Sequence, residues 1–373
     1  MRARSGCVPA RYTAAVRISA APLALLLIAM TAACSTTTPH PTPSPNPTTA
    51  PAPTIAVPTV EPVTRLLFTG DLIPARCTYA KIMALGGDFT LSFQPLHDML
   101  SSADITIGTL DATASDAGTP FGCVQTFSLA APAAGVAGFK YAGYDVLSHA
   151  ANHIKDCGIA SCGDRAMFET DANLRAAGIK SVGTGRNLFE ARAPQIIERH
   201  GVSFAFLAYD DIASYYQAGD DTAGSAPLDP ATIADDVANA RKYANVVIIV
   251  PHWGVEYTAD PSPRQREFAR AAAAAGADMI VGNHPHWVEA HEQIGKMFVA
   301  YALGNFVFDQ DWSLETQQGA ILEATFTGAH LTATHYTAIH IYDQYQPRLA
   351  DPPEAQQILD RIEAASAKLS AAP

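Results

Sequence analysis

Two short apolar runs in the C-terminal half of the chain each end in histidine. The run VVIIV leads into His252, and the run MIV leads into His284 and His286. The segment between them, residues 263–278, is rich in alanine, has helical periodicity and carries Gly276 where a helix would end. Strand, helix and strand of this length predict a βαβ unit with parallel, adjacent strands. Because ligands bind beyond the carboxyl ends of such strands, we expect the three histidines to converge in a metal-binding geometry.

Three earlier apolar runs also end in side chains that can bind a metal. RLLFTG precedes Asp71, DITIGTL precedes Asp111, and DVLSHAA precedes Asn152. Taken singly, an aspartate at a strand end is usually a cap or turn residue, and a histidine on an apolar strand is usually a core residue. Their shared placement nevertheless predicts one metal site. The predicted ligands are Asp71, Asp111, Asn152, His252, His284 and His286.

The predicted ligands are carboxylates, an amide and imidazoles, a set that suits manganese, iron or zinc. Two such divalent ions could clamp an oxyanion and deprotonate a water. Three neighbouring residues, His153, Glu256 and Arg76, are candidate catalytic groups. Glu256 could be a ligand, a general base or a loop carboxylate, and Arg76 could orient an anionic substrate or be simply solvated. Asn305 and Asp309 could brace the histidines from behind, or reflect turn chemistry.

From residue 65 onward, apolar strand patterns alternate with helical patterns. A hairpin is expected to turn at His200 and Gly201, and four β segments follow the histidine strands. Interleaved βα units and consecutive hairpins predict an α/β protein with two sheets, mixed and antiparallel, between layers of helices. We expect one domain over residues 65–345 and a C-terminal helical segment over residues 346–373.

The N-terminal region has the three parts of an export signal. Arginines come first, then the apolar run APLALLLIAM, then small residues before Cys34. The segment 1–34 resembles a bacterial lipoprotein signal, although Thr31 stands where leucine is usual; an ordinary cleaved signal and an uncleaved anchor are the alternatives. Residues 35–64 are rich in proline and threonine and predict an extended spacer. The expected location is therefore extracytoplasmic, on the cell membrane through a lipid anchor.

The charge balance argues against one class of partner. The formal net charge is −12, and because the first 33 residues contain four arginines and no acid, the remainder has 20 basic and 36 acidic side chains. Non-specific nucleic-acid binding depends on Lys and Arg at phosphates, so nucleic acid is not an expected partner. For an anionic polymer or a phosphate-containing small molecule, a bound metal would have to supply the positive charge.

Four cysteines follow Cys34, and an exported chain lives in an oxidising compartment where an even set is usually paired. Locality favours a disulfide between Cys157 and Cys162. The remaining pair, Cys77 and Cys123, would join the loops that follow two of the predicted ligands. Four cysteines allow three pairings, so this arrangement is a hypothesis, and a cysteine metal site is a weaker alternative.

The order of ligands is similar to that of calcineurin-like metallophosphoesterases, and the fuller resemblance is to the capsule-synthesis CapA family of poly-γ-glutamate synthesis proteins. It is carried by FTGDLI, SHAANHIKDCG, GTGRNLFEARAP, HWGVEY, GADMIVGNHPHWVEAHE and AYALGNFVFDQ, within about residues 65–325. The resemblance implies a four-layer αββα metallophosphatase-like sandwich. The chain departs from the family pattern at Thr109, Asp111, Ala151 and Asn283. It also has Ile73 where phosphoesterases have histidine, so one metal site could be weakened.

Two classes of function fit this sequence. The first is a metal-dependent hydrolase or transferase that acts on a phosphoryl group or a γ-amide of a capsule or other cell-surface polymer. The second is an assembly factor that binds an acidic polymer through the same metals without turnover. Family resemblance favours a role with polyglutamate or capsule, and analogy of fold favours phosphate-ester hydrolysis. We expect a hydrolase, and the sequence leaves both classes open.

Overall fold

The computed structural model describes residues 61–124, 126–158 and 161–371. The predicted export signal, Cys34 and residues 35–60 of the predicted spacer lie outside these ranges. Among the described residues, no helix combines the length and the apolar composition needed to cross a membrane.

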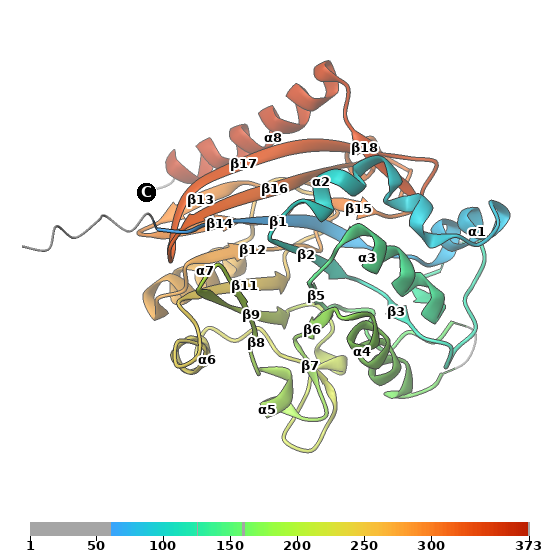
Figure 1. Ribbon diagram of the computed structural model, residues 1–373, viewed down its shortest axis with the longest axis horizontal. Coiled ribbons are helices and arrows are strands. Elements are labelled where there is room, and N and C mark those ends of the chain that lie inside the picture. The colour runs from blue at the N-terminus through green and yellow to red at the C-terminus, as the bar shows by residue number, and fades with distance from the viewer. Residues whose placement is uncertain (1–60, 125, 159–160, 372–373) are drawn as a thin grey trace, which may run out of the picture. The chain divides into compact units, whose positions relative to one another are not determined.

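The first sheet is mixed and has eight strands (Figure 1). Its path runs β18-β17-β16-β1-β2-β5-β6, and β15 also pairs with β1. The strands β1, β2, β5 and β6 are parallel, whereas β16 is antiparallel to β1. The strands are β1 (Val63–Leu72), β2 (Ile105–Leu110), β5 (Val146–Ser148), β6 (Lys180–Val182), β15 (Asn305–Val307), β16 (Gln318–Thr327), β17 (His330–Tyr342) and β18 (Gln346–Leu349).

The second sheet has six strands in the order β13-β14-β12-β11-β9-β8. Its strands are β8 (Gln195–Arg199), β9 (Val202–Asp210), β11 (Val246–His252), β12 (Met279–Val281), β13 (His291–Ile294) and β14 (Met297–Ala300). The parallel pair β11 and β12 flanks α7 (Pro263–Ala275), which confirms the predicted βαβ unit. The predicted hairpin is also confirmed, because β8 and β9 are antiparallel and turn at His200 and Gly201, both with positive φ.

Two small ribbons complete the strand inventory of the described residues. They are the pair β3 (Thr113–Ala114) and β4 (Ala130–Ala131), and the pair β7 (Thr184–Gly185) and β10 (Gly224–Ser225). The remaining helices are α1 (Arg76–Ala84), α2 (His97–Ser101), α3 (Val136–Ala142), α4 (Arg165–Ala177), α5 (Leu188–Ala191), α6 (Ile233–Ala240) and α8 (Pro352–Ala371).

Successive side chains on each strand point to opposite faces of the sheet, and the apolar ones form three layers. On β1, Leu66 and Phe68 lie in the core between the two sheets, whereas Leu67 lies in the core under α2, α3 and α4. On β11, Ile248 faces the core between the sheets and Ile249 packs in the core under α6 and α7. Helices therefore cover the outer faces of two stacked sheets, and the predicted four-layer αββα sandwich is confirmed.

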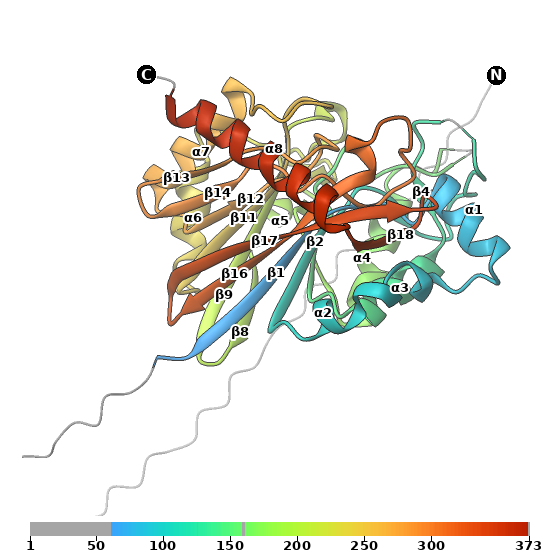
Figure 2. The same cartoon turned by 90° about the horizontal axis from the view of Figure 1, so that it is seen from above.

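The C-terminal segment differs in part from the expectation. Residues 346–349 form the edge strand β18, and the helix α8 begins only at Pro352. Ile358 and Ile362 of α8 pack against Ala320 and Ala338 of β16 and β17, and Figure 2 shows the helix crossing these strands. The apolar face of α8 thus closes the open side of the long hairpin.

Both predicted disulfides are present. Cys157 bonds to Cys162, and Cys77 at the start of α1 bonds to Cys123 in the loop between β3 and β4. The helix α1 is not among the elements expected from sequence. The first turn of this helix is held by Asp309, whose carboxylate accepts from the backbone N–H of Cys77 at 2.9 Å across 232 residues. Because the acceptor is so distant in sequence, the residues around α1 contain no signal for the start of this helix.

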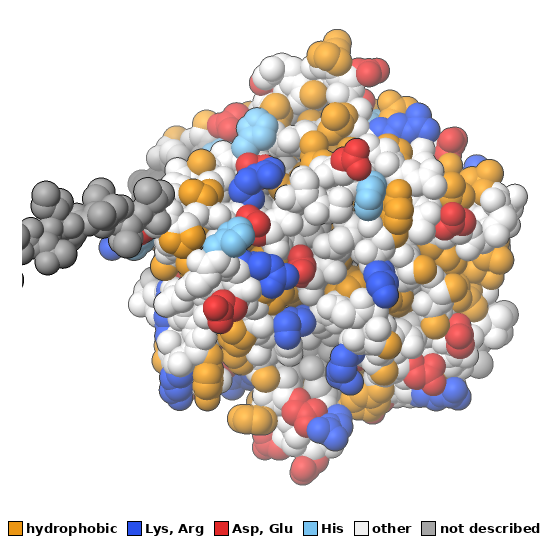
Figure 3. All heavy atoms as spheres, viewed as in Figure 1, with side chains coloured by type: hydrophobic (Ala, Val, Ile, Leu, Met, Phe, Trp, Pro, Cys, Tyr) orange, Lys and Arg blue, Asp and Glu red, His pale blue; other side chains and the backbone are white. Residues whose placement is uncertain are grey.

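Basic and acidic side chains are interspersed on the face shown in Figure 3. This mixture accompanies a formal net charge of −12 for the whole chain. The face therefore lacks the single-sign field with which proteins attract long polyanions.

Candidate metal centre

The carboxyl ends of strands from both sheets meet at one place. Asp71 is the second-to-last residue of β1 and Asp111 follows β2 in the first sheet, while His252 ends β11 in the second. Nδ1 of His252 lies 3.7 Å from Oδ1 of Asp71, and its Nε2 lies 3.6 Å from Oδ1 of Asp111. All three side chains are fully or almost fully buried. The side chains expected to meet at strand ends thus lie close together where the two sheets meet.

Asn152 joins this group from the turn that follows β5. Its Oδ1 lies 2.7 Å from Nε2 of His252, and Nδ1 of His284 lies 3.2 Å from the same nitrogen. Three predicted ligands, Asn152, His252 and His284, therefore converge on one point. The expected third strand is shorter than predicted, because β5 ends at Ser148 and Asn152 lies in a turn.

His284 and His286 lie in the loop after β12 in an unusual backbone conformation. Their φ values are 103° and 59°, which side chains other than glycine seldom adopt. The backbone N–H of His284 donates to Oδ2 of Asp71 at 3.1 Å, and Nδ1 of His286 lies 3.8 Å from that oxygen. Such strain persists where surrounding contacts fix it, and it is common at functional sites.

Close backbone packing places Asp71. A Cβ on Gly70 would lie 1.9 Å from the carbonyl oxygen of Gly304, so only glycine fits there. The N–H of Asp71 donates to that same carbonyl at 3.0 Å. The glycine before the aspartate is therefore part of how the sequence positions the carboxylate.

Asn305 orients His286. Nδ1 of His286 lies 3.0 Å from Oδ1 of Asn305, and the Nδ2 of Asn305 donates to the carbonyl of Thr316 at 2.8 Å. The second bond identifies which end of the amide faces the imidazole, so Nδ1 of His286 carries the proton and Nε2 has the free lone pair. This bracing role is one of the two alternatives that the sequence left open for Asn305.

The residues present fit a divalent cation. Oδ1 of Asp71, Oδ1 of Asp111 and Nδ1 of His252 are buried without a hydrogen-bond partner among the described residues. Such atoms carry a desolvation cost unless a partner compensates it. Ligand atoms of Glu256, His284 and His286 also lie within 4.8 Å of one another. Carboxylates with imidazoles and an amide are a donor set for manganese, iron or zinc.

The pKa shifts of the buried carboxyl and imidazole groups also fit a bound divalent cation. Burial raises the pKa of Asp71 well above its ordinary value, with a further contribution from Asp111, and burial raises the pKa of Asp111 to about 6. Burial lowers the pKa of His252 and His284 well below the usual value and that of His286 to about 3. Neutral imidazoles are the form that binds metals. A bound cation would supply the positive charge that compensates the two buried carboxylates.

The three candidate catalytic residues have different surroundings. Nδ1 of His153 lies 2.6 Å from Oδ2 of Asp156, and its side chain is 16% exposed. Burial by itself lowers the pKa of His153, but the charges of Asp111 and Asp156 outweigh burial and raise it. Sequence reasoning did not give Asp156 a role, although its spacing of three residues from His153 was a usable signal.

Glu256 and Arg76 lie on the outer side of the cluster. Oε1 of Glu256 lies 3.9 Å from Nε2 of His286, and its side chain is 44% exposed. The guanidinium of Arg76 is paired with Asp309 and donates to the carbonyl of Thr126 at 2.7 Å. Arg76 is therefore not simply solvated, and its possible role in orienting an anionic substrate stays a prediction.

From sequence, Asn283 was noted only as a departure from the family pattern, and no structural role was expected for it. Its Nδ2 donates to Oγ1 of Thr109 at 2.8 Å, which joins the loop after β12 to the end of β2. Its Oδ1 is buried without a partner in the described part of the chain. Thr109 and Asn283 are two of the positions where the chain departs from the family pattern, and here they contact each other.

The fold and the site define a class of protein: an αββα sandwich with a cluster of carboxylate, amide and histidine side chains between its sheets. The family model described as bacterial capsule synthesis protein PGA_cap matches residues 65–310. The chain therefore belongs to the bacterial capsule synthesis protein family.

Individual relatives agree with this assignment. The chain is 36% identical over 182 residues to the PGA biosynthesis protein CapA of Bacillus subtilis, covering 48% of this chain and 46% of that protein. It is 29% identical over 265 residues to the capsule biosynthesis protein CapA of Bacillus anthracis, covering 69% and 62%. The chain thus matches about half to three fifths of the length of these relatives.

Among solved structures, the NAD nucleotidase of Haemophilus influenzae is similar with a TM-score of 0.43 and 11% sequence identity. That similarity covers 81% of this chain and 62% of the nucleotidase.

Proposed function

We propose that this protein is an exported, membrane-tethered hydrolase that cleaves a bond in an anionic cell-surface polymer at a divalent-metal centre. The observation that carries the proposal is the convergence of buried, unpartnered ligand atoms from Asp71, Asp111 and His252. Poly-γ-glutamate, the polymer that the family resemblance implies, is the first substrate to test, and the relative in Bacillus subtilis is named as a PGA biosynthesis protein. The tether is the lipid anchor expected at Cys34.

Two metal ions at such a centre would polarise a phosphoryl or amide oxygen and lower the pKa of a bound water. Asp71, Asp111, Asn152, His252, His284 and His286 are the residues that would hold them. His153 is positioned to give a proton to the leaving group, because Asp156 fixes its ring through Nδ1 and leaves Nε2 available. Glu256 lies beside His286 at the side of the cluster that is open to solvent.

A second candidate is binding of the polymer without turnover. Ile73 favours it, because this residue is fully buried in the core at the position where phosphoesterases carry a histidine ligand. The first strand then contributes Asp71 alone. An incomplete metal pair would still hold an acidic polymer while supplying less activation of water.

Turnover of three probes by the purified protein tests the proposal. Poly-γ-glutamate, a generic phosphodiester and a generic phosphomonoester are each incubated with metal-loaded protein. Release of product from one of them is expected, with a loss of about 10²- to 10⁴-fold in His153→Ala at unchanged metal content. His330→Ala, an exposed residue at the start of β17, is the control and should match the wild type. No product from any probe, with metal bound, would favour the binding protein.

The location has its own test. Cys34→Ala should release the protein from the membrane fraction if the cysteine carries the lipid. Retention of the variant, together with an unmodified Cys34 in the wild type by mass spectrometry, would contradict the tether and leave the chemistry of the metal centre untouched.

A further inference from the structure

A cleft of about 840 Å³ opens beside the candidate metal centre. Tyr257 lines it and stacks on the ring of His286, with the ring centroids 6.0 Å apart. Trp312 lines it as well, and its ring meets that of Tyr257 at 6.1 Å and 78°. A substrate whose reacting group lies at the histidines would therefore extend along these two aromatic faces.

The aromatic lining of the cleft is exposed to solvent. Phe127 is 93% exposed, Trp312 is 56% exposed and Tyr257 is 39% exposed. Clustered exposed aromatics on a soluble protein typically mark a binding surface. Tyr257 has a φ of 62°, and the donation of its N–H to the carbonyl of Pro285 at 2.9 Å holds it there. The backbone that carries this ring is thus held in a strained conformation, as is common at functional sites.

The charges of the cleft do not suit a polyanion. Among the described residues that line it, Arg76 is the one basic side chain and is already paired with Asp309, and Asp311 adds a further carboxylate. A chain of carboxylates lying here would meet net negative charge rather than a row of cations. The part of the substrate that occupies this cleft is therefore not a run of carboxylates.

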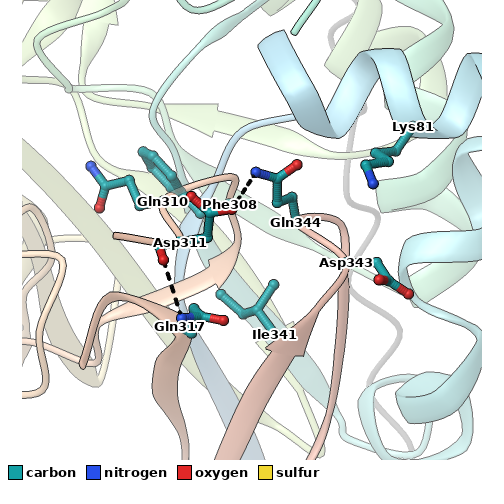
Figure 4. A pocket seen from close by; sticks show the side chains of 8 residues that line it. All are labelled: Lys81, Phe308, Gln310, Asp311, Gln317, Ile341, Asp343 and Gln344. Carbon is teal, nitrogen blue, oxygen red and sulfur yellow. Dashed lines mark hydrogen bonds between the residues drawn. The ribbon is translucent and has the colours of Figure 1, made fainter. Parts of the chain in front are cut away.

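A smaller hollow of about 270 Å³ continues the cleft, because Asp311 and Gln344 line both (Figure 4). Its lining is mostly amide and carboxyl side chains, and Nε2 of Gln344 donates to Oδ2 of Asp311 at 2.7 Å. Lys81 is outnumbered there by two aspartates. Phe308 lines the hollow and also meets the ring of His286 at 4.8 Å, so this hollow too adjoins the metal centre.

We propose that the cleft and the hollow bind neutral pyranose rings of a saccharide that is joined to the anionic group held at the metal centre. A pyranose ring has apolar C–H faces that pack on aromatic rings, and hydroxyl groups that donate to carboxylates and pair with amides. Exposed aromatics in one half of the site and amides with carboxylates in the other match both features. The inference deepens the proposed function, on which it rests, by naming a substrate class for the same site.

Calorimetric titration of the full chain tests this assignment. The probes are cellotetraose and chitotetraose, which are neutral β-1,4-linked saccharides, and a γ-linked glutamate tetramer for comparison. At least one saccharide should bind the wild type, and Trp312→Ala and Tyr257→Ala should each weaken binding about tenfold or more. Trp312→Phe keeps an aromatic face and should retain most of the affinity. Tyr243→Ala, which removes an exposed tyrosine outside the cleft, should bind like the wild type.

Three outcomes would overturn the assignment. They are no binding of either saccharide, wild-type binding by Trp312→Ala, and a glutamate tetramer whose binding is lost in Trp312→Ala. Metal content, measured on the same samples, separates this proposal from the hydrolase. His252→Ala should lose metal and keep saccharide binding, whereas Trp312→Ala should keep metal and lose saccharide. If the wild type binds saccharide but contains no metal, the proposed metal-dependent hydrolase function is wrong and the assignment of the cleft still holds.

Discussion

Nε2 of His252 lies 2.7 Å from Oδ1 of Asn152, a residue 100 positions earlier in the chain. His252 ends a strand of the second sheet, and Asn152 lies just beyond a strand of the first. The contact therefore joins the two sheets at the point where the buried carboxylates also lie. Ligands drawn from both sheets make the centre depend on how the sheets stack.

The metal content of the protein should depend on His252. Protein purified without chelator should carry a divalent transition metal, and His252→Ala should lose it, because the imidazole lies between both buried carboxylates. Elemental analysis after dialysis measures the stoichiometry. His330→Ala, an exposed histidine on β17, should retain the wild-type content. Equal metal content in the two variants would show that the cluster is not the site.

Asn305 should act on the metal through His286. Removing its amide in Asn305→Ala frees the imidazole to rotate, and the expected loss of metal affinity is about 10- to 100-fold. Asn305→Asp keeps an acceptor oxygen for Nδ1 of His286 and should recover much of that loss. Competition with a chromogenic chelator gives both affinities. If Asn305→Ala binds metal as tightly as the wild type, the orienting role is wrong.

Glu289 should make stability depend on pH. Burial raises its pKa to about 8, against an ordinary value of 4.5, and Gln265 is its hydrogen-bond donor at 2.7 Å. The folded state keeps a proton that the unfolded state releases, so this group costs nothing below pH 4.5 and destabilises the fold progressively as pH rises to 8. The loss is on the order of 3 kcal/mol by pH 7.

The variant Glu289→Gln removes the titrating group and keeps the shape. Its free energy of unfolding, measured with urea, should exceed that of the wild type at pH 8 and differ little at pH 4.5. A difference that is the same at both pH values would mean that Glu289 is not protonated in the fold.

The two disulfides should stabilise the protein unequally. Cys77 and Cys123 are 46 residues apart, and Cys157 and Cys162 are 5 residues apart. If restriction of the unfolded chain dominates, replacing the first pair by serine costs about 4 kcal/mol and replacing the second about 2 kcal/mol. Urea unfolding of the two double variants measures this. A larger loss from the short loop would point to native contacts rather than chain entropy.

Several features of the fold could be predicted from the sequence because their signals are local. The apolar runs before His252 and His284, with the alanine-rich segment between them, specify a βαβ unit by length and periodicity alone. Because the candidate metal ligands follow apolar runs, they were expected at the carboxyl ends of neighbouring strands. Cysteine locality indicated the disulfides that the structure contains.

Other features depend on partners that are distant in sequence. The helix α1 starts where Asp309 accepts from Cys77, and Arg76 is neutralised by that same aspartate. Neither contact could be read from residues near position 76. The role of Asp156 beside His153 was missed for a different reason, because a carboxylate three residues away has many other local uses.

Short segments of the sequence specify which residues can carry the chemistry and which elements hold them, since hydrophobic period, turn residues and strand ends are local properties. The three-dimensional packing brings Asn152 to His252 across two sheets and Asn305 to the ring of His286. It also stacks Tyr257 on that ring and places Trp312 against Tyr257. These relationships come from stacking and loop closure over long separations. Such packing sums many weak contacts, so no single segment encodes it.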